Sequence, residues 1–293
     1  MNNNSNQIVN LPPFTYFDTD LSTYGFFKKF MFIIKAKFLG FVVNNMNKNI
    51  FCFFINLFYK SDGKIMYQNN IYFKDLSKSI RVHYPNKRIL RSVSNYQKHF
   101  NHLFDSYMFN KILFSDGDLV IDCGANVGEI NIALKLQGIY VNYFAFEPDP
   151  ESFKALILNN PESKENLYQI GLSNKSGKSN FYMDSFGGNS SLIDFGSDSK
   201  ISINTVRYDS YNFKNPVKVL KIDAEGFEPE VLEGCGDELR NIEYVSVDYG
   251  AEKGESQDST IIEVNNFLYK NDFKLIDFNY KRIIGLYKNN LMK

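Results

Sequence analysis

Two kinds of hydrophobic pattern divide this chain of 293 residues. From about residue 119 onward, short apolar runs of strand length alternate with segments whose apolar residues recur every three or four positions, the spacing of a helix. The predicted strands cover residues 119–123, 140–146, 167–170, 217–223 and 242–250, and the predicted helices cover 127–136, 152–159, 228–234 and 261–269. This alternation predicts an α/β domain with a mostly parallel sheet and helices on both of its faces.

Two further pairs of apolar segments depart from the alternation. Residues 178–183 and 201–208 are predicted to form an inserted antiparallel pair. The last two segments, residues 273–280 and 282–290, are predicted to form a hairpin that adds an antiparallel edge to the sheet.

The first hundred residues follow a different pattern. Residues 25–43 and 50–59 are strongly apolar and aromatic, and no acidic residue occurs between residues 21 and 61. The same segment contains these lysines: Lys28, Lys29, Lys35, Lys37, Lys48 and Lys60. No uninterrupted apolar run reaches the ~20 residues that a membrane-spanning helix needs.

Two interpretations of this segment stay open. In the first, its helices pack on the rest of the protein or on a second copy in a homo-oligomer, because aromatic stripes at helical spacing are usually part of a core. In the second, residues 25–60 form a basic amphipathic surface that rests peripherally on anionic lipid, at the inner face of the membrane.

Residues 63–91 contain short alternating apolar pieces, which predict a small β region. Helical spacing returns over residues 96–114 and predicts a helix there. We therefore expect an N-terminal helical and β extension over residues 1–104 and the α/β domain over residues 105–293.

Composition narrows the class of protein. The formal net charge is zero, so the basic face that a nucleic-acid partner requires is not expected. The three cysteines are widely spaced and form no CxxC pair, which is typical of reduced thiols in the cytoplasm. The first residues do not combine a basic stretch with an apolar one, so no signal peptide is expected.

The segment that follows strand 119–123 has the composition of a nucleotide-binding loop. Gly124 and Gly128 let the backbone approach a ligand closely, and the next helix offers free N–H groups. A dinucleotide fingerprint would place glycine where the chain has Asn126 and Glu129, and a glutamate there would bring negative charge near a pyrophosphate. No Gly-Lys-Ser/Thr sequence follows, which excludes a P-loop.

S-adenosylmethionine fits the same loop better, because it has no phosphate but carries a carboxylate, an ammonium group and a sulfonium. Asp122 at the strand end suits the ammonium, directly or through water, and the free helix N–H groups suit the carboxylate. Glu147 lies at the end of the second strand, nineteen positions after Gly128, where a carboxylate can accept both ribose hydroxyls. We therefore predict S-adenosylmethionine as the cofactor.

Three acids, Asp223, Glu225 and Glu228, come together after strand 217–223. Acids held close to one another repel, which favours one of them as a general base. Two alternatives are a divalent ion that polarises the acceptor hydroxyl, and a purely structural role in which Asp223 orders the cofactor and Glu228 caps the next helix. We expect Asp223 and Glu225 to be catalytic and Glu228 to contact the substrate, with no metal.

The segment GGNSSL supplies two more candidates. Ser190 and Ser191 are predicted to contact the substrate, and the alternative is a polar loop without such a role.

Five stretches together resemble the FkbM-type S-adenosylmethionine-dependent methyltransferases. They are DCGANVGE (122–129), AFEPDP (145–150), GLSNKSG (171–177), SSL (190–192) and KIDAEGFEPEVLEG (221–234). The similarity covers roughly residues 105–250 and weakens beyond, and KIDAEGFE is its most specific part.

The resemblance implies a class I methyltransferase fold, a seven-stranded Rossmann-like sheet with its last strand antiparallel. It also implies methyl transfer to an oxygen, usually a hydroxyl of a sugar or a secondary metabolite. In place of the glutamate expected near the end of the fifth strand, the chain has Asp248. The residues expected to bind the cofactor are Asp122, Gly124, Ala125, Asn126, Gly128, Glu147, Pro148 and Leu172.

Together these features predict a cytoplasmic O-methyltransferase that acts on a hydroxyl of a sugar, a glycan or a glycolipid precursor. One alternative is an O-methyltransferase of a polyketide-like secondary metabolite. Another is a non-catalytic S-adenosylmethionine-binding module in polysaccharide assembly. A nucleic-acid acceptor is not expected, because neither an Asn/Asp-Pro-Pro-Tyr loop nor a Pro-Cys nucleophile occurs.

Overall fold

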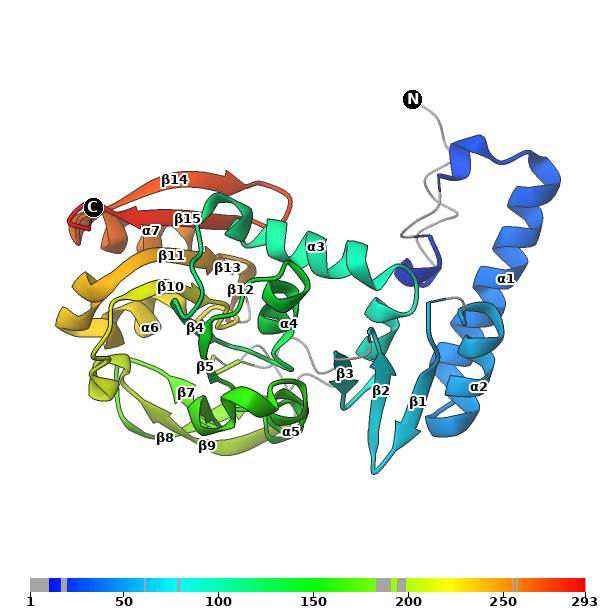
Figure 1. Cartoon of the computed structure of the whole chain (residues 1–293), viewed down its shortest axis with the longest axis horizontal. Coiled ribbons are helices and arrows are strands. Elements are labelled where there is room, and N and C mark those ends of the chain that lie inside the picture. The colour runs from blue at the N-terminus through cyan, green and yellow to red at the C-terminus, as the bar shows by residue number, and fades with distance from the viewer. Residues whose placement is uncertain are drawn as a thin grey trace. The chain divides into compact units, whose positions relative to one another are not determined.

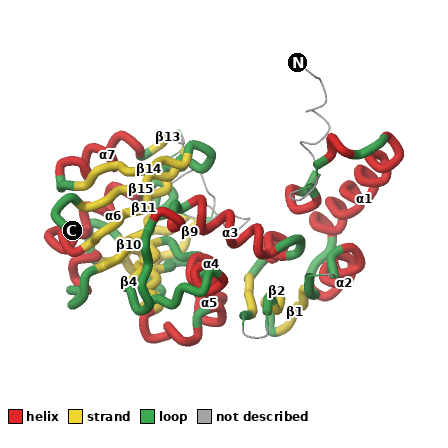
Figure 2. Tube along the Cα trace, turned by 45° about the horizontal axis from the view of Figure 1, so that its top comes forward, coloured by secondary structure: helices red, strands yellow, loops and turns green. Residues whose placement is uncertain are grey.

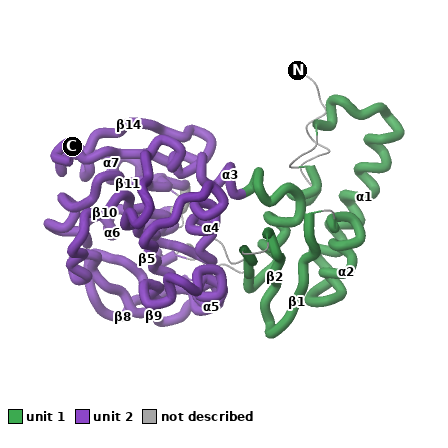
Figure 3. Tube along the Cα trace, in the orientation of Figure 1, with its two compact units in different colours: residues 1–99 green, residues 100–293 purple. Residues whose placement is uncertain are grey.

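The computed structural model divides into two compact units, residues 1–99 and residues 100–293 (Figure 3). The structure describes residues 11–16, 20–60, 62–77, 80–182, 191–193, 199–254, 256 and 258–292.

The N-terminal unit combines two helices with a three-stranded antiparallel sheet. Its elements are α1 (Phe26–Asn45), α2 (Lys48–Phe58), β1 (Ile65–Gln68), β2 (Ile71–Asp75) and β3 (Arg81–Tyr84). The amide of Asn56 ties α2 to β1, because it donates to the carbonyl of Ile65 at 2.8 Å and accepts from its N–H at 2.9 Å. The predicted helices and β region of this unit are confirmed. Within the described residues, none of the helices is both long enough and apolar enough to cross a membrane.

Helix α3 (Tyr96–Ser106) crosses the division between the units. The predicted helix over residues 96–114 is wrong beyond Ser106. Met108 has a left-handed backbone with φ of 57°, which breaks the helix, and a short 3-10 turn follows over Phe109–Lys111.

The C-terminal unit is built on a seven-stranded sheet with the order β14-β15-β11-β10-β4-β5-β6 (Figure 1). The strands are β4 (Leu119–Cys123), β5 (Asn142–Phe146), β6 (Leu167–Tyr168), β10 (Val217–Ile222), β11 (Ile242–Asp248), β14 (Phe273–Asn279) and β15 (Ile284–Asn289). Strands β6, β5, β4, β10 and β11 pair in parallel, and β15 is antiparallel to both of its neighbours. This order and the antiparallel seventh strand are those of a class I methyltransferase fold.

The predicted closing hairpin is confirmed, because β14 and β15 pair antiparallel, and the structure adds which of the two strands is outermost. Strand β15 lies between β11 and β14, so β14 forms the edge of the sheet. Burial follows this order, because β15 is buried along almost its whole length whereas most of β14 is exposed or partly exposed.

Helices cover both faces of this sheet (Figure 2). They are α4 (Glu129–Leu136), α5 (Pro150–Asn159), α6 (Glu228–Cys235) and α7 (Ile261–Lys270). Apolar side chains of α6 and α7 share one hydrophobic core with alternate residues of β4, β10 and β11, whereas those of α4 and α5 lie outside this core. The predicted α/β architecture is confirmed.

Two small sheets and several short helical turns complete the fold. Strands β7 (Gly171–Leu172), β9 (Lys200–Val206) and β8 (Gly177–Tyr182) form one sheet, in which β8 and β9 are the predicted antiparallel pair. Strands β12 (Ala251–Lys253) and β13 (Asp258–Ser259) form the other. The remaining 3-10 turns are Pro13–Thr15, Leu21–Thr23, Lys87–Ser92, Pro161–Asn166, Tyr208–Tyr211 and Gly236–Asn241.

Candidate functional site

Strand register places polar side chains on the sheet face opposite the α6 and α7 core. Lys221 in β10 is paired with Asp122 in β4 on one side and with Ser246 in β11 on the other. Because side chains of paired residues project to the same face of a sheet, these three lie side by side. Their neighbours Cys123, Ile222 and Val247 belong to the opposite core. The carboxyl ends of β4, β10 and β11 therefore present charge on one face only.

The loop after β4 passes very close to the loop after β10. Gly124 has φ of 70°, and a Cβ atom there would lie 1.8 Å from the carbonyl oxygen of Asp223. Asn126 also has a left-handed backbone, with φ of 49°, and Gly128 precedes α4 with φ of 78°. Glycine at position 124 is thus required by contact as well as by conformation.

Glu147 fixes the shape of this loop from the end of β5. Its Oε2 accepts a hydrogen bond from the N–H of Asn126 at 2.6 Å, and its Oε1 accepts one from the N–H of Asp149 at 2.8 Å. Burial raises the pKa of Glu147 to about 7, although both backbone N–H groups favour its ionised form.

The chemistry of Glu147 fits the ribose of S-adenosylmethionine. A carboxylate has about four acceptor positions, and the two backbone N–H groups use two of them. The other two suit two neighbouring hydroxyls. The left-handed turn at Gly124 and Asn126 is the kind of backbone conformation that lets a ligand approach the main chain closely.

A buried ion pair contacts the backbone of the loop after β4. The Lys221 ammonium lies 2.9 Å from Oδ1 of Asp122, and it donates to the carbonyl oxygens of Gly124 at 2.8 Å and Cys123 at 3.2 Å. Oδ2 of Asp122 accepts a hydrogen bond from the Tyr143 hydroxyl at 2.6 Å. Burial opposes the charge of Lys221, but Asp122 and Asp223 outweigh it and raise the pKa of the lysine.

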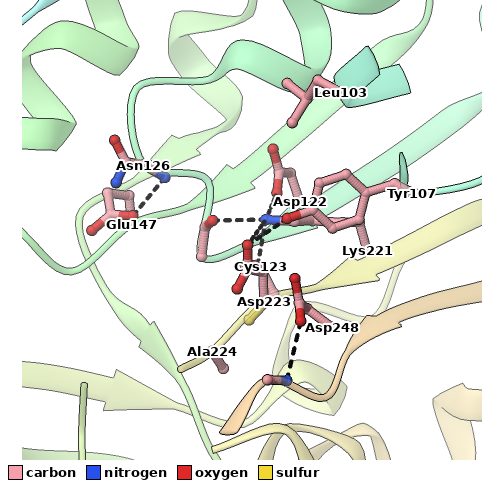
Figure 4. Close-up of polar contacts among 12 residues, drawn as sticks. Leu103, Tyr107, Asp122, Cys123, Asn126, Glu147, Lys221, Asp223, Ala224 and Asp248 are labelled. Atoms are coloured by element: carbon pink, nitrogen blue, oxygen red, sulfur yellow. Dashed lines mark hydrogen bonds and ion pairs between the residues drawn. The ribbon is translucent and has the colours of Figure 1, made fainter. Parts of the chain in front are cut away.

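Asp223 lies next to this pair, between Lys221 and Tyr107 (Figure 4). Its Oδ2 accepts a hydrogen bond from the Tyr107 hydroxyl at 2.5 Å and lies 3.8 Å from the Lys221 ammonium. The Arg282 guanidinium lies over the ring of Tyr107, 5.2 Å from its centroid, and pairs with Asp248 at 3.2 Å.

Charges of opposite sign therefore alternate across the ends of β4, β10 and β11. Burial opposes the charge of Arg282, but Tyr107, Asp223 and Asp248 raise its pKa above the ordinary value. Burial and the nearby Asp223 carboxylate raise the pKa of Tyr107 well above its usual range, so its hydroxyl stays protonated and donates to Asp223.

The three acids of the KIDAEGFE stretch have different surroundings. Asp223 and Glu225 are partly exposed, whereas Glu228 is 1% exposed. Oε1 of Glu228 accepts from the N–H groups of Ala224 at 3.1 Å and Gly226 at 2.9 Å, and its Oε2 accepts from the Thr260 hydroxyl at 2.8 Å. Glu228 thus holds the loop that presents Asp223 and Glu225, and burial raises its pKa to about 7.

The structure brings one of the two predicted serines to the same loop. Ser191 is buried, and its hydroxyl donates to the carbonyl oxygen of Glu225 at 2.7 Å. Ser190 lies outside the described residues. Among the predicted cofactor residues, Ala125 and Leu172 are buried and Pro148 is partly exposed. Within the described residues, no group of three His, Cys, Asp or Glu side chains has the arrangement of a metal site.

Sequence reasoning assigned no role to Lys221, Tyr107 or Arg282. A signal existed for Lys221, because a lysine inside the apolar run VKVLKI requires a buried partner, and Asp122 ends the first apolar run. Tyr107 and Arg282 reach the site from segments far apart in the chain, and their spacing carries no signal.

Comparison with known proteins identifies the family of this chain. The family described as the methyltransferase FkbM domain matches residues 122–275, just over half of the chain. The chain belongs to the FkbM methyltransferase family. This confirms the predicted family, and with it a methyltransferase domain whose cofactor is S-adenosylmethionine.

One curated relative is the hexuronic acid methyltransferase AglP of Haloferax volcanii, which is 28% identical over 141 residues. The match covers 46% of this chain and spans 57% of the relative's length.

Two solved structures also match. The methyltransferase FkbM from Methylobacillus flagellatus KT has 12% identity and a TM-score of 0.45, with 87% of this chain and 59% of that chain covered. TrmK of M. capricolum, in complex with S-adenosyl-homocysteine, has 9% identity and a TM-score of 0.38, with coverages of 65% and 67%.

Proposed function

We propose that this FkbM methyltransferase transfers a methyl group from S-adenosylmethionine to a hydroxyl of a sugar, in a glycan or a glycolipid precursor. The observation that carries the proposal is the pair of partly exposed acids, Asp223 and Glu225, on a loop that touches the cofactor loop at Gly124. A relative that methylates a hexuronic acid, as its name states, supports a sugar as the acceptor class.

In this proposal the loop after β4 would bind the cofactor, and the loop after β10 would remove the proton from the acceptor. The first loop, with Glu147 behind it, would hold the ribose, and the N–H groups at the start of α4 would hold the carboxylate of the cofactor. Asp122, whose oxygens already contact Lys221 and Tyr143, would contact the cofactor ammonium directly or through water. When bound, S-adenosylmethionine supplies an electrophilic methyl group on its sulfonium.

The second loop would take up the proton. Asp223 or Glu225 accepts the proton of the acceptor hydroxyl as the oxygen becomes nucleophilic. Tyr107 orients the Asp223 carboxylate, and Glu228 holds the backbone between them. The buried position of Glu228 favours this positioning role, and its predicted contact with the substrate stays a prediction.

The test is methyl transfer from labelled S-adenosylmethionine to sugar and glycolipid fractions of a cell extract. Asp223→Asn and Glu225→Gln should each reduce turnover, by about 100-fold or more for the residue that is the base. Both should leave the affinity for S-adenosylmethionine, measured by calorimetry, within a few-fold of the parent. Near-normal turnover in both variants would refute the catalytic assignment.

The place of action is part of the proposal. Cys52, Cys123 and Cys235 are free and buried, which is compatible with the cytoplasm. We propose that the enzyme works there, peripherally at the inner face of the membrane, where glycolipid precursors are presented. A homo-oligomer formed through the N-terminal helices is the competing hypothesis.

A further inference from the structure

We infer that the exposed faces of α1 and α2 form one docking surface for an anionic lipid bilayer. This lipid-binding surface is separate from the proposed methyl-transfer site. It rests on the proposed function only in that the proposed enzyme works at the membrane. Of the large apolar side chains that are exposed among the described residues, nearly half belong to these two helices. They are Phe26, Phe27, Phe30, Met31, Ile34, Phe38 and Phe41 in α1, and Ile50, Phe53, Leu57 and Phe58 in α2.

The exposed residues of α1 form a single stripe. Phe27, Met31, Ile34, Phe38 and Phe41 follow one another at steps of four and three, which places them on one side of the helix. The buried residues Ala36, Leu39 and Val42 recur at steps of three and face the unit's own core. The helix is therefore apolar on two sides, and its own unit covers only one of them.

The stripe continues from α1 onto α2. The rings of Phe38 and Phe58 have centroids 5.9 Å apart, and those of Phe38 and Phe54 are 5.7 Å apart. Both Phe38 and Phe58 keep more than a third of their surface exposed. Ile50, Phe53 and Leu57 then extend the apolar surface along α2 at steps of three and four. The two stripes thus join into one surface, called here the helical apolar face.

Charge indicates what covers this face. Residues 21–60 contain six lysines and no acid, whereas the whole chain has zero net charge. The remainder of the chain therefore carries an excess of six acids. Lys28, Lys29 and Lys37 are exposed on α1, and Lys35 lies over the ring of Tyr59 at 4.5 Å with its stem along the helix pair.

A bilayer with anionic headgroups complements this arrangement. Apolar side chains enter the boundary between headgroups and acyl chains, and lysines at the edge of the stripe reach the phosphates. A second copy of the face would instead bring twelve lysines together, with no acid in either copy of residues 21–60. Charge complementarity therefore favours lipid over self-association.

The experiment uses the full chain and vesicles without cofactor or acceptor. Co-sedimentation is measured with vesicles of phosphatidylcholine alone and of equal parts phosphatidylcholine and phosphatidylglycerol. The parent protein should bind the anionic vesicles about tenfold more tightly, and salt should weaken that binding. The double variant Phe30→Glu/Ile34→Glu should lose binding to both, and Lys28→Glu/Lys37→Glu should lose the preference for anionic vesicles.

Matched controls lie in the other unit. Ile262→Glu replaces an isoleucine of α7 that is even more exposed than Ile34, and Lys270→Glu reverses an exposed lysine of the same helix. Both should bind vesicles like the parent, and circular dichroism should show that every variant is folded. Three results would overturn the inference: no binding of the parent to anionic vesicles, unchanged binding of the Phe30→Glu/Ile34→Glu variant, or a dimer in sedimentation velocity that this variant converts to a monomer. Because no methyl transfer is measured, failure of the proposed reaction leaves this result intact.

Discussion

At the residue scale, Lys221 is the countercharge of Asp122, whose side chain is completely buried. Replacing Lys221 by methionine leaves that carboxylate with the Tyr143 hydroxyl as its neighbour in the ion-pair cluster. We expect Lys221→Met to lower the free energy of unfolding by about 3–5 kcal/mol, measured by urea denaturation. Lys218→Met is the matched control on the same strand, because its partly exposed pair with Glu243 should contribute only about 1 kcal/mol or less.

A double-mutant cycle separates stability from positioning. Asp122→Asn/Lys221→Met removes both charges, so it should be more stable than Lys221→Met alone. Methyl transfer should stay low in the double variant, because the carbonyl of Gly124 has lost its donor. If the two single changes are additive in unfolding free energy, the proposed coupling between the two charges is wrong.

The raised pKa of Glu147 leads to a prediction on how cofactor affinity depends on pH. Its pKa of about 7 means that the carboxyl is mostly protonated at pH 6 and mostly ionised at pH 8. If only the ionised form accepts both ribose hydroxyls, the affinity for S-adenosylmethionine should rise about tenfold over this range. Calorimetry on Glu147→Gln should show weaker binding without this rise, and an equal pH dependence in parent and variant would contradict the assignment.

Local sequence was sufficient to place Glu147 and the glycines, because a turn after a strand is a local feature. The partners of Asp122 were not predictable in the same way. They depend on which strand lies beside β4 and on the register between them, and neither can be inferred from β4 itself. Tyr107 was missed because its segment was expected to be helical, and the left-handed residue Met108 ends that pattern without any glycine or proline as a signal.

At the element scale, the contact between the loops after β4 and β10 holds the candidate site together. Gly124→Ala would place a Cβ atom 1.8 Å from the carbonyl oxygen of Asp223, so one of the loops must move. We expect a loss of about 3 kcal/mol or more in unfolding free energy, and loss of measurable cofactor binding.

Gly117→Ala is the control for this change. Gly117 also has a positive φ, of 83°, but no atom of the described residues lies within 4 Å of the Cβ position. It should cost only the backbone strain, about 1–2 kcal/mol, and leave cofactor binding unchanged. Equal effects of the two substitutions in thermal melts and in calorimetry would show that conformation, rather than contact between the loops, requires glycine at position 124.

The order of the strands shows the limit of pattern reasoning at this scale. The alternation of strand and helix correctly predicted a parallel sheet, because a parallel connection needs a crossover helix. The closing hairpin contains no such information, because either of its strands could pair with β11. The structure places β15 inside the sheet, where it is buried along almost its whole length, and β14 at the edge, where most of its residues are exposed or partly exposed.

At the scale of the whole molecule, positive charge is concentrated in residues 21–60, although the net charge of the whole chain is zero. The zero net charge is an average over the whole chain, and it hides the six lysines of residues 21–60. Hydrophobic pattern alone left both core packing and lipid contact open for these helices. Only the structure distinguishes the apolar residues that face the unit's own core from those that stay exposed.

The last prediction joins the helical apolar face to the methyl-transfer reaction. If a glycolipid acceptor is met at the membrane, docking raises its effective concentration at the enzyme. Labelled methyl transfer to a cellular lipid extract should then be about tenfold slower for Phe30→Glu/Ile34→Glu when the extract is presented in phosphatidylglycerol-containing vesicles. With the same extract in detergent micelles, this variant should match the parent, and Ile262→Glu should match it in both. An equal loss in micelles and vesicles would mean that the two substitutions damage the catalytic unit, because detergent removes the advantage of docking while leaving the chemistry of Asp223 and Glu225 unchanged.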